Sequence, residues 1–235
     1  MPAPSEAVPL EASIFDMDGL LVDTEPLWHE AEVEVLGALG VPLEPSACRQ
    51  TKGMFVDEVT RYWFERYPWR GPATDEVATR VVDAVMALVS ARGRLQPGVG
   101  RALDLCLRHG LPLAVASSSP YRLIDLVLDH FGLRRHFELV HSAQEEPWGK
   151  PHPGVFLTAA AKLDVPPDRC LVWEDAPAGV LAAKAARMTC VAVPEPAERH
   201  RPDVAIADVV LDTLEEADET LWERLVAARR APVLG

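Results

Sequence analysis

An apolar run near the start of the chain, Ala12 to Phe15, leads into two aspartates, Asp16 and Asp18, that are two residues apart. Such a run predicts a buried strand, which we expect over residues 11–16. Side chains alternate along a strand with a period of two, so both carboxylates point the same way at its carboxyl end. Two like charges held so close repel, unless a cation lies between them or one carboxyl stays protonated. The stretch therefore predicts a reactive or metal-binding site.

The second half of the chain alternates apolar strand patterns with helical patterns. We expect helices over 98–109, 120–131, 153–163, 177–186 and 214–230, and strands over 111–117, 137–141, 170–173, 189–193 and 209–211. This alternation with short links is typical of an α/β fold with a doubly wound, Rossmann-like parallel sheet. In such sheets, ligands bind outside the carboxyl ends of the strands.

About 70 residues between the first strand and this alternation show only helical spacing. Apolar residues recur near the helical period over 26–40, 53–67 and 75–92. We therefore expect a small helical domain over 25–95, inserted after the first strand, and a main domain formed by 1–24 and 96–235. Residues 1–10 are expected to form a loose tail.

Composition narrows the classes of partner. A chain of 235 residues with 49% apolar and 25% charged residues is typical of a globular enzyme. Its net charge of −13 argues against nucleic acid or an anionic membrane as a partner. No apolar run reaches the roughly 20 residues of a membrane span, and no signal peptide is recognisable. We expect a cytoplasmic monomer whose four cysteines, which lack CxxC spacing, are buried free thiols.

Groups that can bind an anion follow two later segments. Ser117 and Ser118 come directly after an apolar strand, where hydroxyl and backbone N–H donors at a helix start suit a phosphate. Lys150 lies between a glycine and a proline just before a predicted helix, so its ammonium group has little freedom to move. The alternative for Lys150 is an exposed lysine in a turn.

Two more carboxylates, Glu174 and Asp175, follow the next apolar strand. Strand ends of a parallel sheet meet at one edge, so we expect these side chains near Asp16 and Asp18. Acids that only cap the N-terminus of a helix are the alternative.

The order of these motifs resembles that of the haloacid dehalogenase (HAD) superfamily. Its four motifs look like DxDGxxxDTE at 16–25, the serines at 117–119, KPHP at 150–153 and the acids at 174–175. The resemblance extends over essentially the whole chain, from Ile14 to about Leu214.

The resemblance implies a role for each of these residues. Asp16 would be the nucleophile that attacks a phosphoryl group, and Asp18 the general acid and base. Ser117, Ser118 and Lys150 would bind the phosphoryl oxygens.

It also implies a magnesium ion as cofactor. Asp16, Asp175 and the backbone carbonyl of Asp18 would bind Mg²⁺, an ion that prefers oxygen ligands. Glu174 would bind it directly or through water.

The helical insertion resembles the C1 cap, which covers the active site in this superfamily. Trp28, near the expected entrance, is our candidate for contact with the substrate. The aromatic residues between 62 and 69 could stack on a sugar, but we expect them to form the core of the small helical domain.

Within the superfamily, the chain is most similar to phosphatases of hexitol phosphates and 2-deoxyglucose 6-phosphate, in the subgroup that includes β-phosphoglucomutase. It is therefore expected to hydrolyse small sugar or sugar-alcohol phosphate monoesters through an aspartyl-phosphate. A β-phosphoglucomutase-type mutase and a non-catalytic protein of the same fold remain alternatives. The mutase is disfavoured because Trp28 and Val56 align with its cap histidine and arginine. A dinucleotide-binding module is disfavoured because GxGxxG does not follow the first strand.

Overall fold

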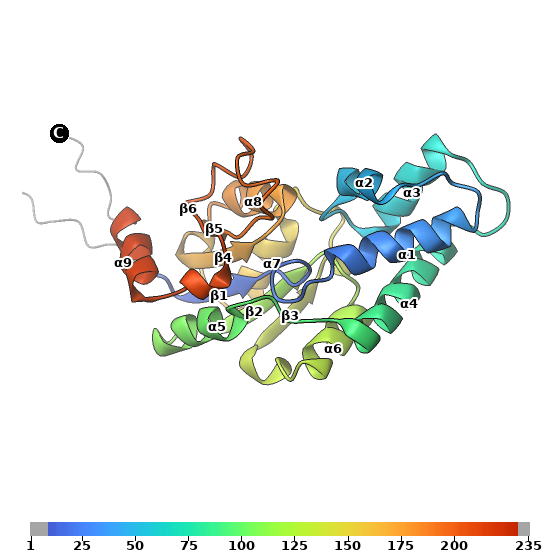
Figure 1. Cartoon of the computed structure of the whole chain (residues 1–235). Coiled ribbons are helices and arrows are strands. Elements are labelled where there is room, and N and C mark those ends of the chain that lie inside the picture. Colours follow the sequence, from blue (N-terminus) through green and yellow to red (C-terminus); the bar gives the residue numbers. More distant parts are fainter. Residues whose placement is uncertain (1–8, 230–235) are drawn as a thin grey trace, which may run out of the picture.

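The computed structural model describes residues 9–229, which form a six-stranded sheet in the order β3-β2-β1-β4-β5-β6 (Figure 1). The strands are β1 (Ala12–Phe15), β2 (Leu113–Ser117), β3 (Leu139–Ser142), β4 (Cys170–Glu174), β5 (Thr189–Ala192) and β6 (Val209–Val210). All neighbouring strands are parallel. The predicted α/β class with a doubly wound parallel sheet is confirmed.

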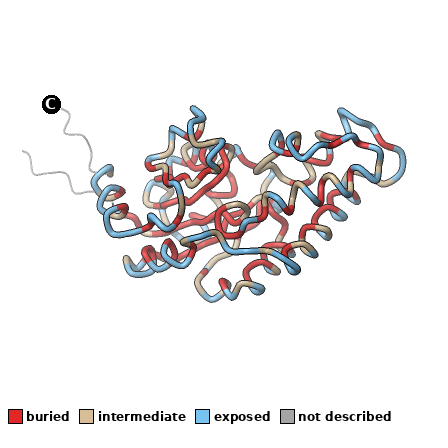
Figure 2. The backbone as a smooth tube through the Cα atoms, viewed as in Figure 1, coloured by how far each residue is buried: buried red, intermediate tan, exposed pale blue. Residues whose placement is uncertain are grey.

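Helices cover both faces of this sheet, which explains why the central strands read as continuous apolar runs. The core helices are α5 (Val99–Arg108), α6 (Tyr121–His130), α7 (Gly154–Lys162), α8 (Pro177–Ala185) and α9 (Glu219–Ala228). Phe15 of β1 faces the side of α5, α6 and α9 and stacks on Trp173 at 5.5 Å between ring centroids. Its neighbour Ile14 faces the opposite side, with α7 and α8. Figure 2 shows this buried centre.

The helical insertion lies at one end of the molecule (Figure 1) and consists of α1 (Glu25–Gly37), α2 (Pro45–Cys48), α3 (Val56–Arg66) and α4 (Thr74–Arg92). It has an apolar cluster of its own, in which Trp63 and Trp69 are buried. The expectation that the aromatic segment forms core therefore holds for these two tryptophans, whereas Phe64 and Tyr67 are 36% and 42% exposed. The domain boundaries at residues 25 and 95 stay a prediction.

Some sequence expectations need correction. The short helix α2 was not expected. The last helix begins at Glu219 rather than at 214, because the Asp218 side chain accepts a hydrogen bond from Leu221 N at 2.9 Å and so caps a new helix. Leu10, placed in the loose tail, is buried in the core. Residues 1–8, and the expected end of the last helix at 230, lie outside the described residues.

All four cysteines are buried and free, as expected. Across residues 9–229, no helix combines the length and the apolar character that a membrane crossing requires.

Two glycines at the start of α5 give a matched test of the fold. Gly98 has a φ of +87°, and a Cβ there would lie 2.1 Å from Glu215 N, whereas a Cβ at Gly100 meets nothing within 4 Å. We expect Gly98→Ala to lower the free energy of unfolding by about 2 kcal/mol or more, through left-handed strain and overlap. Gly100→Ala, inside the helix, is expected to raise it by roughly 0.5–1 kcal/mol. Urea unfolding of both variants measures the difference, and equal effects would contradict the backbone geometry at Gly98.

Candidate active site

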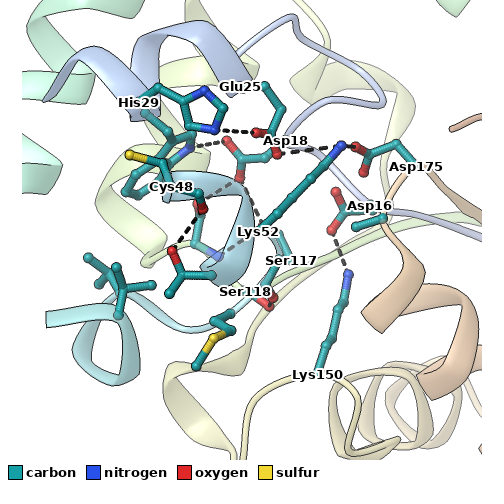
Figure 3. A pocket seen from close by; sticks show the side chains of 18 of the residues that line it. Asp16, Asp18, Glu25, His29, Cys48, Lys52, Ser117, Ser118, Lys150 and Asp175 are labelled. Carbon is teal, nitrogen blue, oxygen red and sulfur yellow. Dashed lines mark hydrogen bonds and ion pairs between the residues drawn. The ribbon is translucent and has the colours of Figure 1, made fainter. Parts of the chain in front are cut away.

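The residues predicted from the sequence gather around one pocket at the carboxyl edge of the sheet (Figure 3). The pocket has about 650 Å³ of empty space, including its open mouth. It is bounded by β1, β2 and β4 on one side and by α1, α3 and the segment between α2 and α3 on the other. All eight expected site residues line it: Asp16, Asp18, Trp28, Ser117, Ser118, Lys150, Glu174 and Asp175.

Lys150 joins two of the carboxylates. Its Nζ lies 2.6 Å from Asp16 Oδ1 and also donates to Glu174 Oε1. All three side chains are buried. Burial lowers the pKa of Lys150, but Asp16 and Glu174 outweigh this effect and raise it, so the ammonium group stays charged. The pKa of Asp16 is raised well above its usual range, mainly by burial, and Lys150 opposes that shift.

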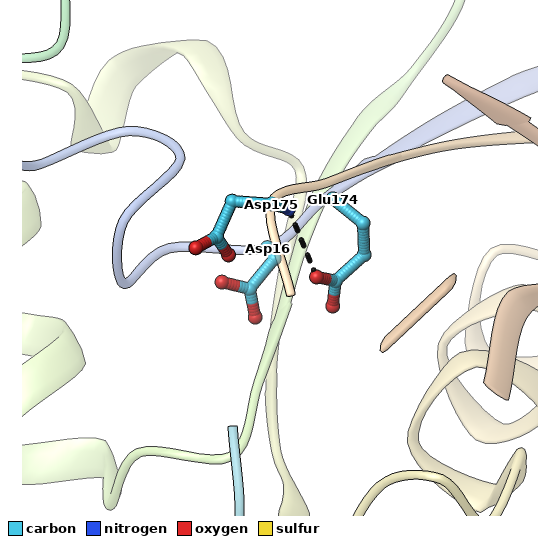
Figure 4. A group of neighbouring side chains, drawn as sticks. All are labelled: Asp16, Glu174 and Asp175. Carbon is cyan, nitrogen blue, oxygen red and sulfur yellow. Dashed lines mark hydrogen bonds between the residues drawn. The ribbon is translucent and has the colours of Figure 1, made fainter. Parts of the chain in front are cut away.

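Asp16, Glu174 and Asp175 form a cluster in which one carboxylate oxygen of each residue lies within 4.8 Å of the other two (Figure 4). Burial raises the pKa of Asp175 to about 8, although Lys52 Nζ lies 2.9 Å from its Oδ2. Among residues 9–229, Asp175 Oδ1 has no hydrogen-bond donor, whereas Oδ2 contacts the Lys52 ammonium group. Crowded buried carboxylates, one of which has an oxygen without a partner, fit a hard divalent cation such as Mg²⁺.

The main chain leaves room for this cluster at Gly19. A Cβ on that residue would lie 2.3 Å from Asp175 Oδ2, and its φ of +79° suits glycine. The glycine of the first motif therefore lets the loop after β1 approach β4.

Asp18 has a different environment from Asp16. Its Oδ1 accepts hydrogen bonds from Thr24 Oγ1 at 2.8 Å and Trp28 Nε1 at 2.9 Å. Its Oδ2 accepts from Ser119 Oγ at 2.7 Å and from Ser117 Oγ at 3.4 Å. Four donors from the loop after β1, from α1 and from the end of β2 hold this carboxyl in one orientation.

Trp28 lines the pocket and donates its indole N–H to Asp18 Oδ1, while its expected contact with substrate stays a prediction. The next residue, His29, pairs with Glu25 rather than with Asp18, because its Nε2 lies 3.2 Å from Glu25 Oε2 (Figure 3). Trp28 and His29 have different partners because adjacent side chains on a helix are turned about 100° from each other.

The serines link the two sides of the pocket. Ser117 Oγ accepts from Ser119 N at 3.0 Å, in a tight turn at the end of β2. Ser118 Oγ donates to Gly53 O at 3.0 Å, a contact between the core and the helical insertion. The sequence predicted these two residues but did not predict the hydrogen bond of Ser119 to Asp18.

Lys52 is a second buried lysine at the site that the sequence analysis did not propose. Its side chain is 5% exposed, and its Nζ lies 2.9 Å from Asp175 Oδ2, 3.2 Å from Glu198 Oε2 and 3.4 Å from Glu195 Oε1. It comes from the segment before α3 and contacts three acids of the main domain. The sequence gives little signal for this role, because the partners are more than a hundred residues away.

Glu32 is a further pocket residue that was not predicted. It lies on α1, is only 6% exposed, and its Oε2 accepts no hydrogen bond from residues 9–229. Burial raises its pKa to about 7, and the nearby Cys48 thiol and His29 oppose that shift. Its position four residues after Trp28, on the same face of α1, is a signal that helical periodicity offers.

The raised pKa of Glu32 has a measurable effect on stability. The folded state favours the neutral carboxyl, so this contribution to stability is present below pH 4.5 and is lost as the pH rises through about 7. We expect Glu32→Gln to gain stability relative to the native chain between pH 5 and 8, by at most about 3 kcal/mol. Urea unfolding at the two pH values measures this gain.

The control is Glu34→Gln, which changes an exposed glutamate of the same helix. Its stability relative to the native chain should not depend on pH. If the free energy of unfolding of Glu32→Gln had the same pH dependence as that of the native chain, the raised pKa of Glu32 would be contradicted.

Comparisons with known proteins identify the family of this chain. The family model described as "haloacid dehalogenase-like hydrolase" matches residues 10–187. Hexitol phosphatase B of Escherichia coli (strain K12) is 44% identical over 206 residues, 87% of this chain and 93% of that protein. Fructose-1-phosphate phosphatase of the same organism is 32% identical, over 77% of this chain and 94% of that protein.

A solved structure, the β-phosphoglucomutase of Clostridium difficile, superposes with a TM-score of 0.82 at 25% identity. The match covers 93% of this chain and 98% of that one.

Proposed function

This chain belongs to the haloacid dehalogenase-like hydrolase family, and we propose that it hydrolyses small sugar or sugar-alcohol phosphate monoesters through an aspartyl-phosphate. It is a sugar-phosphate phosphatase by its similarity to hexitol phosphatase B and fructose-1-phosphate phosphatase. The proposal concerns its mechanism, its metal and its range of substrates.

One observation carries the mechanism: two aspartates two residues apart lie in different environments. Asp16 is paired with the Lys150 ammonium group, whereas Asp18 is surrounded by four neutral donors. A pair of carboxyl groups in unlike surroundings is suited to separate roles, one as nucleophile and one as proton carrier.

Asp16 is proposed to attack the phosphorus atom. Attack by a carboxylate on a phosphate needs the repulsion between two anions to be reduced. We expect Lys150, next to Asp16, the hydroxyl group of Ser117 and the backbone N–H of Ser118 to bind the phosphoryl oxygens.

Asp18 is proposed to move the protons. In the first step it donates a proton to the leaving alkoxide oxygen of the substrate. In the second step it accepts a proton from the water that hydrolyses the aspartyl-phosphate, which returns Asp16 as a carboxylate and releases phosphate. The hydrogen bonds from Thr24, Trp28 and Ser119 orient the carboxyl for both transfers.

Asp16, Asp175 and the backbone carbonyl of Asp18 are proposed to bind Mg²⁺. Glu174 is placed to assist, since its Oε2 also accepts from the backbone N–H groups of Asp175 and Ala176 and is thereby fixed in position. When bound, Mg²⁺ supplies positive charge that offsets the charge of the phosphoryl group.

The helical insertion, residues 25–95, is proposed to act as a cap that covers the pocket and excludes water. A mutase of the β-phosphoglucomutase type is the alternative, because such an enzyme shares the fold. The indole of Trp28 beside Asp18 disfavours it, since Trp28 aligns with the histidine that holds the acid in the mutase.

The first prediction concerns turnover. We expect the native chain to release phosphate from hexitol and hexose phosphates in the presence of Mg²⁺, and EDTA to abolish release. Asp16→Asn removes the nucleophile and should lower kcat by at least about a thousandfold. A malachite-green phosphate assay with a panel of esters measures both effects.

Three results would contradict the proposal. Phosphate release that persists in Asp16→Asn excludes that residue as the nucleophile. Full activity in EDTA excludes the metal. Conversion of β-glucose 1-phosphate to glucose 6-phosphate without net phosphate release favours the mutase.

The second prediction concerns Trp28. Trp28→Phe keeps an aromatic side chain but removes the N–H that donates to Asp18, so kcat should fall on the order of tenfold. Trp63→Phe is the matched control, because the indole N–H of that buried cap tryptophan has no partner among residues 9–229. Equal activity of the two variants would show that the Trp28 hydrogen bond does not orient Asp18.

A further inference from the structure

Glu32 differs from the other acids of the pocket because it lies away from the phosphoryl site. It is carried by α1, one helical turn beyond Trp28, whose indole contacts Asp18. One turn corresponds to about 5.4 Å along the helix axis. Glu32 therefore lines the part of the pocket that extends from the leaving-group oxygen into the helical insertion.

The carboxylate of Glu32 interacts with the Cys48 thiol, but one of its two oxygens has no partner in the part of the chain that the structure describes. The Oε2 atom has no donor among residues 9–229, although the side chain is 6% exposed. A buried polar atom without a partner destabilises a fold. The buried oxygen of Glu32 that has no donor among the described residues therefore indicates that a ligand supplies the missing hydrogen bond.

The surroundings of Glu32 restrict what this ligand can be. The helical insertion also lines the pocket with the polar side chains of His29, Thr51 and Cys48 and the apolar side chains of Met54 and Val59. Polar groups and aliphatic surface together suit the alternating C–H and O–H groups of a polyhydric alcohol.

A hydroxyl group also fits Glu32 in either protonation state. The pKa of about 7 means that both the neutral and the ionised form are present near neutral pH. A hydroxyl can donate to the ionised form and accept from the neutral form. An ammonium group can only donate, and so pairs with the ionised form alone.

We infer that Glu32 binds a hydroxyl group in the alcohol part of the substrate and thereby selects polyhydroxylated phosphate esters. The inference rests on the proposed phosphatase function and adds a specificity residue to it. The hydroxyl lies on a carbon remote from the phosphoester, because Asp18 and Trp28 occupy the space next to the leaving-group oxygen.

The test compares substrates in Glu32→Gln. Steady-state kinetics are measured with sorbitol 6-phosphate and with hexyl phosphate, which has the same number of carbons but no hydroxyl group. Hydrogen bonds to a charged group are stronger than neutral ones, so kcat/KM for sorbitol 6-phosphate should fall about 10- to 100-fold. The value for hexyl phosphate should stay within about twofold.

Controls separate a specific role from a structural one. Glu34→Gln, on the exposed face of α1, should leave both substrates unchanged. Urea unfolding of Glu32→Gln verifies that the variant is folded. A third ester, glucosamine 6-phosphate, distinguishes a hydroxyl ligand from an ammonium ligand.

Each contrary result overturns a distinct statement. Equal losses with sorbitol 6-phosphate and hexyl phosphate, or no loss with either, overturn the role of Glu32 and leave the phosphatase function intact. A loss confined to glucosamine 6-phosphate overturns the hydroxyl assignment. If the native chain hydrolyses none of the esters, the proposed function fails and the inference fails with it.

Discussion

The crowding of acidic side chains at one edge of the sheet is the constraint on which the site depends. The register of β1 with β4 places Phe15 opposite Trp173, so the acids that follow the two strands meet at the same height. Two lysines offset this negative charge. Lys150 belongs to the core and contacts Asp16, and Lys52 belongs to the helical insertion and contacts Asp175. Without these cations, or a metal ion, three buried carboxylates would repel one another.

The helix α1 connects this charged edge to the rest of the pocket. Glu25, Trp28 and Glu32 recur along it at intervals of three and four residues, which places them on one face. They contact, in order, Lys52, Asp18 and the proposed remote hydroxyl. One helix thus carries the residue that pairs with Lys52, the residue that orients Asp18 and the residue proposed to select the substrate.

The sequence predicted the sheet, its six strands and eight of the residues that line the candidate site, because those depend on local patterns. Apolar strands that run into Asp16, Ser117 and Glu174 can be read from short stretches, and parallel topology brings strand ends together. Capping by Asp218 was overlooked, so the last helix was placed too early.

Other features depend on partners far apart in the chain, and sequence patterns do not contain them. Lys52 meets Asp175 and Glu198 only after the insertion has packed on the core. Glu32 looks like an ordinary surface glutamate in the sequence, because only the tertiary packing around α1 removes it from water. The hydrogen bond of Trp28 to Asp18 likewise needs the tertiary fold.

The burial of both lysines affects how an anionic substrate approaches. The chain carries a net charge of −13, and the side chains of Lys150 and Lys52 are 2% and 5% exposed. At a distance a phosphate ester therefore encounters a repulsive field, and it meets these two cations only inside the pocket. Salt shortens the range of that repulsion, to about 8 Å at physiological ionic strength. Encounter with the pocket thus becomes faster as ionic strength rises, the opposite of an enzyme that attracts its substrate by long-range steering.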